Sequence, residues 1–182
     1  AKQYSRNSMT PPIAAINSFF ANIMKKPNLR LKAPKKKIVN KVPLTYNEVM
    51  RLFNIAKDNP MDYAMITTLY YSQLRTSEIC NLNLSDIDFR KGKIMVYDAK
   101  NDKDDIINLH PFAIKAIKEY LPFRLHPKDG TDPLFVSTYK RRISRGIPWK
   151  RVKYYAKLAN IQKRVYTHLF RISSITHMAE GG

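Results

Sequence analysis

Apolar residues recur every three or four positions in several stretches of the chain, which is the spacing of one face of an α-helix. The clearest case is Val49, Leu52, Phe53 and Ala56, which follow the segment Thr45-Tyr46-Asn47-Glu48. A threonine followed three residues later by a glutamate is typical of the capping box at a helix start. Further helices are expected over residues 61–72, from 76 or 77 to before 86, over 112–121, over 149–159, and from 167 onward.

Between residues 87 and 109 the apolar period changes to two, which is the spacing of a half-buried β-strand. The segments 93–97 and 105–109 are predicted to be strands, and the polar tract 98–104 is predicted to be their turn. A brief extended segment is expected at 132–136. We therefore predict an α+β fold that is mainly α, with a small antiparallel β-sheet.

The first part of the chain has a different character. Residues 11–24 place apolar side chains on one helical face, and Pro11 and Pro12 are well placed to start that helix. Residues 25–43 then hold eight Lys or Arg and three prolines, which makes them too charged and too interrupted to pack. We predict a terminal helix within residues 1–30, a basic linker over 31–43, and a folded domain over 44–182.

The net charge of the chain indicates the kind of partner that it binds. The chain has 33 Lys and Arg against 14 Asp and Glu, a formal charge of +19 and a pI near 10.1, which points to a polyanionic ligand. With 44% apolar residues the chain can still form a core. Cys80 is the only cysteine, which excludes an internal disulfide and a cysteine-based zinc site and fits a cytoplasmic protein. No apolar run approaches the roughly 18 residues that span a membrane.

Two arginines in short signatures are the candidates for chemistry. Arg75 lies in Leu74-Arg75-Thr76-Ser77-Glu78, and Arg171 lies in His168-Leu169-Phe170-Arg171. Guanidinium groups are planar, permanently charged forks, so two of them that converge on one point can clamp a single phosphate. His168 and Arg171 are three residues apart and share one face of the expected helix.

Several motifs occur together and in a fixed order. They are Leu44-Thr45 with Glu48-Val49, the segment 74–82 around Arg75, Asp86-Ile87-Asp88, Ala99-Lys100-Asn101-Asp102-Lys103, Leu134-Phe135, and the segment from His168 through Arg171 and His177-Met178 to Gly181. In order and spacing they resemble the tyrosine recombinase (phage integrase) family, from about residue 42 to the end. Residues 1–30 are similar to the last helix of the DNA-clamping domain that precedes the catalytic domain in that family.

The resemblance implies a reaction and a set of roles. A tyrosine hydroxyl attacks a DNA phosphodiester to form a 3′-phosphotyrosine link, which a 5′-hydroxyl later reverses, and no metal, ATP or other cofactor is implied. Arg75 and Arg171 would bind the nonbridging oxygens, Lys100 would be the general acid, and His168 would assist them. Glu78, one helical turn after Arg75, would support the first arginine.

Each of these residues also has a simpler interpretation. Arg75 could be a surface arginine at a helix start, and His168 could cap a helix. Arg171 could pair with a carboxylate. Lys103 competes with Lys100, since hairpin turns are often rich in lysine, and Lys100 is favoured because it matches the lysine position of the family.

The chain departs from the family pattern in two ways. Ile172 follows Arg171 where many relatives have a histidine. None of the 11 tyrosines lies after Arg171, and Tyr166 precedes His168 and is read as an ordinary aromatic residue. We therefore expect a catalytic domain that lacks its C-terminal nucleophile segment and that binds DNA without cleaving it alone. The family also implies a tetramer on DNA for the full-length protein, and a monomer is expected for this fragment.

The remaining basic residues are candidates for contacts with double-stranded DNA, although an ordinary solvated face is the alternative. Two isolated histidines, His110 and His126, precede prolines in expected loops and are predicted to be solvated rather than metal ligands. A non-catalytic basic DNA-binding or RNA-binding protein remains the rival interpretation. The predicted DNA contacts are Lys35, Lys36, Lys37, Lys103, Lys140, Arg141, Arg142, Lys150 and Lys153.

Overall fold

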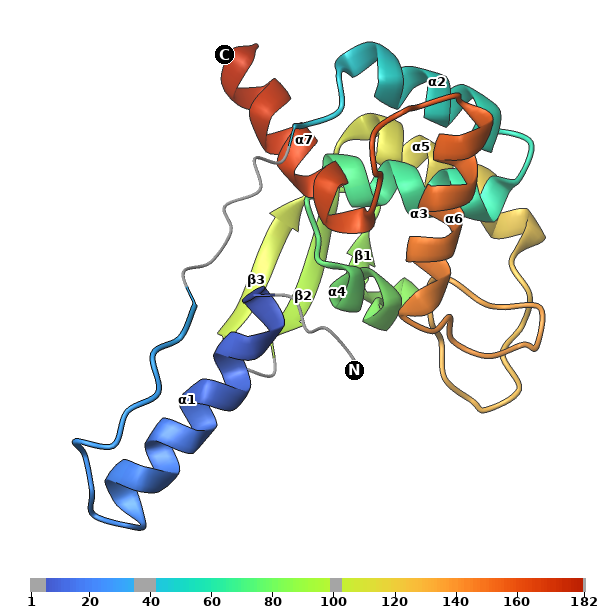
Figure 1. The fold of residues 1–182 in the computed structure, drawn as a ribbon. Helices are drawn as coiled ribbons and strands as arrows, with labels where there is room; N and C mark the ends of the chain where they lie inside the picture. The colour runs from blue at the N-terminus through green and yellow to red at the C-terminus, as the bar shows by residue number, and fades with distance from the viewer. Residues whose placement is uncertain (1–5, 35–41, 99–102, 182) are drawn as a thin grey trace. The chain divides into compact units, whose positions relative to one another are not determined.

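The computed structural model of the chain contains two compact units, Ala1–Lys41 and Val42–Gly182 (Figure 1). It describes residues 6–34, 42–98 and 103–181. None of the helices in these ranges combines the length and the apolar character needed to cross a membrane.

The described part of the first unit, residues 6–34, forms one helix and a segment that runs back along it. Helix α1 spans Arg6–Asn22, so Pro11 and Pro12 lie inside the helix instead of starting it as the sequence suggested. Each proline removes one backbone donor, and the turns on either side continue the helix across the gap. The Asn17 side chain accepts from the Leu31 amide at 2.8 Å and donates to the Leu31 carbonyl at 3.0 Å, which holds the returning segment.

The second unit is organised around one central helix. Helix α3, Pro60–Tyr71, is buried at every position from Ala64 to Tyr70 and packs against five other helices (Figure 1). A helix that is apolar on nearly all sides belongs in a protein interior. It starts where the Asn59 side chain accepts from the Asp62 amide at 3.0 Å. Its neighbours are α2 (Tyr46–Ala56), α4 (Thr76–Asn81), α5 (Pro111–Tyr120), α6 (Gly146–Leu158) and α7 (Thr167–Glu180).

The sheet has three antiparallel strands in the order β1-β2-β3, with β1 at Ile87–Asp88, β2 at Lys93–Asp98 and β3 at Lys103–Asn108. On β2, Ile94 is buried and the next residue, Met95, is exposed, as the alternation predicted. The prediction of a mainly helical α+β fold with a small antiparallel sheet is confirmed. The short strand β1 was not predicted as a separate strand, because two residues are too few to show a period.

Helix α6 begins three residues earlier than predicted. Its first residue is Gly146, and Pro148 lies within the first turn. Proline is tolerated there because the first amides of a helix have no intrahelical acceptor. The extended segment expected at 132–136 forms two isolated bridges, Asn83 with Pro133 and Val136 with Arg142.

The start of the second unit is fixed by α7. The Leu44 amide donates to Ser173 Oγ at 2.8 Å, and the Leu44 carbonyl lies 2.8 Å from His177 Nε2. A carbonyl only accepts, so His177 Nε2 carries the proton and its Nδ1 accepts from the Tyr70 hydroxyl at 2.6 Å. Burial, with smaller contributions from Tyr71 and Tyr46, raises the pKa of Tyr70 to about 12, which keeps this hydroxyl protonated.

A second pair of side chains, Lys163 and Glu48, holds the backbone next to Leu44. Lys163 Nζ donates to the Pro43 carbonyl at 2.9 Å and to Glu48 Oε2 at 2.8 Å. Glu48 also accepts from the Thr45 amide at 2.7 Å and so completes the predicted capping box of α2. We call the side chains of Glu48, Lys163, Ser173 and His177 the linker-exit clamp.

Replacing Glu48 with glutamine is expected to lower the free energy of unfolding at neutral pH by about 1 kcal/mol, because glutamine can keep the hydrogen bond to the Thr45 amide but loses the ion pair with Lys163. Burial alone would raise the pKa of Glu48, but the Lys163 bond and the Thr45 amide outweigh burial and lower that pKa from 4.5. The wild-type contribution is therefore complete above pH 4.5 and is lost as the pH falls through the depressed pKa. Urea unfolding at several acidic pH values measures both effects, and an equally steep acid dependence in Glu48→Gln would contradict the assignment.

Candidate active site

Arg75 is held at the start of α4 by Glu78. The Arg75 amide donates to Glu78 Oε2 at 2.7 Å, and Arg75 Nη1 donates to Glu78 Oε1 at 2.6 Å. One carboxylate thus caps the helix and orients the guanidinium. The Arg75 side chain is 63% exposed and Glu78 is 14% exposed, so the arginine faces solvent from a largely buried brace.

Arg171 reaches the loop that precedes Arg75. It lies on α7 beside the buried residues Leu169 and Phe170, and its Nη1 donates to the carbonyl of Gln73. Gln73 is two residues before Arg75 in the chain. The structure therefore brings the two arginine-bearing segments together, although they are far apart in sequence.

A hydroxyl pair joins the same two segments. Thr76 Oγ1 donates to Thr167 Oγ1 at 2.7 Å, which connects the first turn of α4 to the first turn of α7. Thr76 follows Arg75, and Thr167 precedes His168, whose side chain is exposed. Segments that carry Arg75, His168 and Arg171 thus meet at one place, and the catalytic roles of the three residues stay predictions.

The hairpin lysines are only partly described. Lys100 lies outside the described residues, in the connection between Asp98, the last residue of β2, and Lys103, the first residue of β3. The backbone of Lys103 pairs with Asp98 in the sheet register. Lys35, Lys36 and Lys37 also lie outside the described residues.

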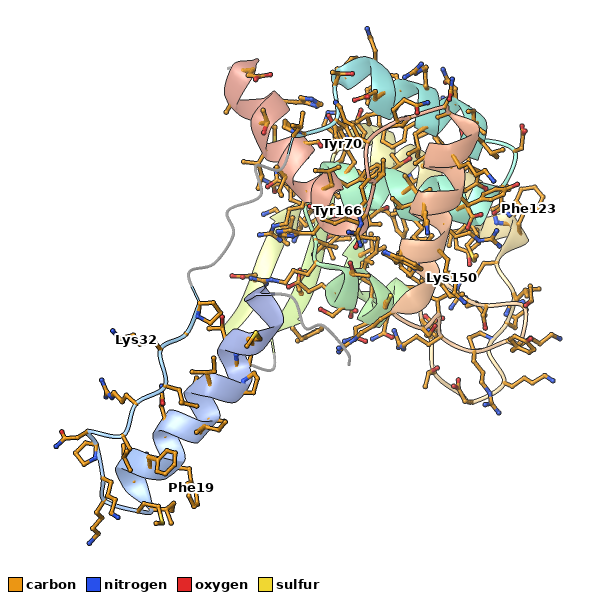
Figure 2. The ribbon with its side chains drawn as sticks, viewed as in Figure 1. Phe19, Lys32, Tyr70, Phe123, Lys150 and Tyr166 are labelled. Carbon is orange, nitrogen blue, oxygen red and sulfur yellow. The ribbon has the colours of Figure 1, made fainter. Side chains whose placement is uncertain are left out.

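Helix α6 displays two of the predicted DNA contacts. Lys150 and Lys153 are both exposed on it, and Figure 2 shows Lys150 near its N-terminal end. Lys153 Nζ lies 5.3 Å from the centre of the Trp149 ring, which is itself 45% exposed. A cation beside an exposed aromatic ring is a combination that suits a nucleic acid, because both phosphates and bases find a partner. Lys140 and Arg141 are exposed in the loop before α6.

A buried carboxylate fixes α6 against α3. Asp62 of α3 is fully buried and accepts from the Tyr155 hydroxyl at 2.8 Å, and Arg151 Nε lies 3.3 Å from the same oxygen. Burial raises the pKa of Asp62, although Tyr155 and Arg151 act in the opposite direction. Because Tyr155 and Arg151 both belong to α6, this contact sets which side of α6 presents Lys150 to solvent.

Arg142 has a structural role that the sequence did not suggest. Its Nη1 donates to the carbonyls of Cys80, Asn81 and Leu82 at 3.1, 2.7 and 3.1 Å. Its Nη2 donates to Asn83 Oδ1 at 2.6 Å. The guanidinium therefore caps the C-terminal end of α4, and the phosphate contact predicted for Arg142 stays a prediction.

His110 lies in a connection, as expected, but the expectation that it is solvated is wrong. His110 is half-buried, its Nδ1 accepts from the Phe112 amide at 3.3 Å at the start of α5, and its ring stacks on Tyr71 at 4.3 Å. No local pattern predicts this contact, because the stacking partner Tyr71 is on α3. His126 is exposed, and the described residues contain no group of three potential metal ligands from His, Cys, Asp and Glu.

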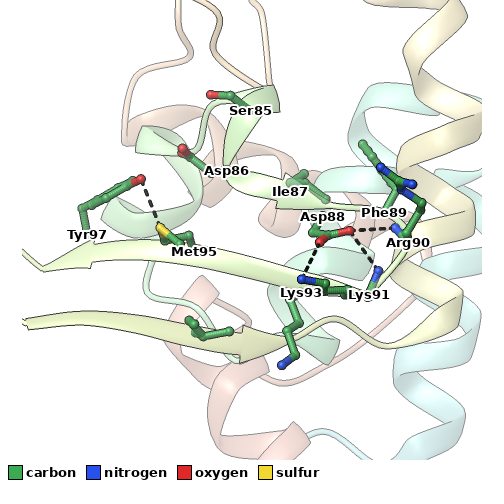
Figure 3. Close-up of a pocket in the computed structure, with 11 residues that line it drawn as sticks. Ser85, Asp86, Ile87, Asp88, Phe89, Arg90, Lys91, Lys93, Met95 and Tyr97 are labelled. Carbon is green, nitrogen blue, oxygen red and sulfur yellow. Dashed lines mark hydrogen bonds and ion pairs between the residues drawn. The ribbon is translucent and has the colours of Figure 1, made fainter.

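The pocket in Figure 3 lies elsewhere, between the segment 85–91 and the face of the sheet formed by Met95, Tyr97 and Ile106. Within it, Asp88 accepts from the amides of Arg90 and Lys91 at 3.0 and 2.9 Å. These bonds shape the turn between β1 and β2. None of Arg75, His168 and Arg171 lines this pocket, so it is distinct from the candidate active site.

Comparison with known proteins agrees with this architecture. The sequence model described as the phage integrase family matches residues 43–182. Tyrosine recombinase XerA of Pyrococcus horikoshii is 33% identical over 190 residues, which cover 98% of this chain and 62% of that protein. The crystal structure of XerA recombinase is similar with a TM-score of 0.72 at 30% identity, covering 98% of this chain and 63% of that one.

A second solved structure supports the fold alone. The Tn1549 transposon integrase in complex with a circular intermediate DNA is similar with a TM-score of 0.79 at 18% identity, covering 98% of this chain and 68% of that one. This chain spans less than two thirds of the length of the XerA relative.

Proposed function

We propose a function for this chain from one premise, which is that it belongs to the phage integrase family. The chain supplies the phosphate-binding pocket of an enzyme that cleaves and rejoins DNA strands at specific sites. A tyrosine oxygen attacks the phosphorus, and the 5′-oxygen leaves with a proton, so the 3′-phosphotyrosine link stores the bond for the reverse step.

The contact between Arg171 and the Gln73 carbonyl carries this proposal, because it ties one predicted phosphate ligand to the loop that bears the other, Arg75. Strand cleavage adds negative charge to the nonbridging oxygens of a five-coordinate phosphorus. Two fixed guanidiniums stabilise that charge with preorganised, charge-assisted hydrogen bonds. His168 assists them from the same helix, and Lys100 protonates the leaving oxygen.

Double-stranded DNA is the proposed ligand. The charge of +19 provides a sequence-independent attraction to phosphate, and α6 adds Lys150, Lys153 and the exposed Trp149. The Tn1549 integrase structure was obtained with DNA, which agrees with this choice for a protein of the same fold. The RNA-binding alternative shares the charge but gives no reason for the segments that carry Arg75 and Arg171 to meet.

The test is a binding titration of the chain with a short labelled DNA duplex at increasing salt. We expect log Kd to rise linearly with log salt concentration, and the double change Lys150→Ala and Lys153→Ala to reduce that slope by about two. The matched control is Lys115→Ala with Lys118→Ala, two exposed lysines of α5, a helix without predicted contacts. Equal competition by a structured RNA would favour the RNA-binding alternative instead.

A further inference from the structure

Gln73 has an unusual backbone for its residue type. Its φ is +55°, in the left-handed region that glycine enters freely and that side chains with a Cβ disfavour. It lies one residue after Ser72, the C-cap of α3, where a left-handed residue often ends a helix. A glutamine in this conformation costs free energy. Such a conformation persists where several surrounding contacts hold the residue in place.

The surrounding contacts come from α7 on both sides of Gln73. Its carbonyl accepts from Arg171 Nη1, and its Nε2 lies 2.9 Å from the sulfur of Met178, two turns further along the same helix. The backbone and the side chain of one residue therefore both contact the helix that carries Arg171 and His168.

The loop on either side of Gln73 is rigidly held. Ser72 Oγ donates to the Thr68 carbonyl at 2.6 Å and lies 3.4 Å from the Leu74 amide, and Leu74 is 2% exposed. One residue later, Arg75 is bound twice by Glu78. The direction of the Gln73 carbonyl is thus set by its own φ and ψ, since its neighbours on both sides are fixed.

We propose that Gln73 is a positioning residue for Arg171. Its left-handed backbone directs the carbonyl at the guanidinium and so fixes the plane in which Arg171 meets a DNA phosphodiester. This inference rests on the proposed function, since it takes the phosphodiester as the ligand. The same short loop would then position Arg171 through the Gln73 carbonyl and would itself carry Arg75.

The experiment compares Gln73→Gly with Gln73→Val. Glycine keeps the positive φ and the carbonyl direction, so Gln73→Gly is expected to retain the salt slope of duplex binding. A β-branched valine opposes a positive φ and turns the carbonyl away, so Gln73→Val is expected to reduce the slope by about one, the value of one phosphate contact. If Gln73→Val does not fold, Gln73→Ala replaces it, because alanine opposes a positive φ less strongly.

A double-mutant cycle separates positioning from general damage. Arg171→Ala is expected to reduce the slope by about one, and adding Gln73→Val should cause no further loss, because both changes remove the same contact. Additive losses, or a Gln73→Val protein that binds like the wild type while Arg171→Ala binds more weakly, would overturn the positioning role.

The Arg171 Nε–Hε signal in NMR spectra of the DNA-free protein distinguishes a failure of the positioning role of Gln73 from a failure of the proposed phosphate-binding role of Arg171. We expect this signal to shift in Gln73→Val and to stay near its wild-type position in Gln73→Gly. An unshifted signal in Gln73→Val, with Arg171→Ala still weakening DNA binding, overturns the positioning role and leaves the proposed function intact. A shifted signal with DNA binding unaffected by Arg171→Ala supports the positioning of Arg171 and overturns its role as a phosphate ligand.

Discussion

Replacing Arg171 with alanine is expected to lower the rate of DNA strand cleavage by about 10² to 10³, the usual cost of one preorganised charge donor. The guanidinium is half-buried and bonded to Gln73, so it needs little reorganisation when charge develops on the phosphate. The substrate is a DNA duplex that the chain selects from a random-sequence pool. Hydrogen peroxide is added as an external nucleophile, which attacks the phosphorus in place of the tyrosine oxygen. Gel electrophoresis then follows the strand released with a 5′-hydroxyl.

Two further variants make the Arg171 result specific. Arg171→Lys keeps the charge but loses the planar fork, so most of the rate loss should remain. Arg51→Ala removes an equal charge from an exposed site on α2, a helix that bears none of the predicted catalytic residues, and should cleave at nearly the wild-type rate. A loss in Arg51→Ala as large as in Arg171→Ala would show that net charge, and not the pocket, controls the rate.

Replacing Arg142 with alanine is expected to lower the free energy of unfolding by about 2 to 3 kcal/mol, because hydrogen bonds from a charged donor contribute more than neutral ones. The change leaves the last carbonyls of α4 without their cap and releases Asn83. Denaturant unfolding monitored by circular dichroism measures the loss. The neighbouring Arg141 is exposed, so Arg141→Ala should change stability by less than about 0.5 kcal/mol.

The same pair of variants separates the two interpretations of the basic segment 140–142. If Arg141→Ala weakens DNA binding and Arg142→Ala weakens stability, the segment divides into a phosphate ligand and a helix cap. An Arg142→Ala protein of wild-type stability with reduced DNA affinity would instead restore the phosphate contact that the sequence predicted for Arg142.

Local patterns were enough to predict much of the fold. Helix α2 was visible from its capping box and apolar stripe, because both signals lie within twelve residues of one another. The alternation at Ile94 and Met95 predicted β2 for the same reason. Pro11 and Pro12 misled the prediction of α1, since a proline pair is favourable at a helix start and is only tolerated inside one.

The contacts that build the site could not be predicted in this way, because they join residues far apart in the chain. The Gln73 carbonyl and Arg171 are 98 positions apart, and Arg142 and Cys80 are 62 apart. No spacing rule connects such pairs, and the left-handed φ of Gln73 has no signal in a glutamine. The contacts of Asp62 could not be predicted either, since its partners Tyr155 and Arg151 lie on another helix.

The linker-exit clamp gives the chain a mechanical property. Both polar groups of the Leu44 backbone are bonded to α7, so the peptide on either side of Leu44 cannot rotate without breaking a bond to the helix that bears Arg171. Tension or torque applied to the chain ahead of Val42 is therefore transmitted to α7 directly. A load that arrives at Val42 therefore reaches the helix that bears His168 and Arg171 through covalent chain and two hydrogen bonds.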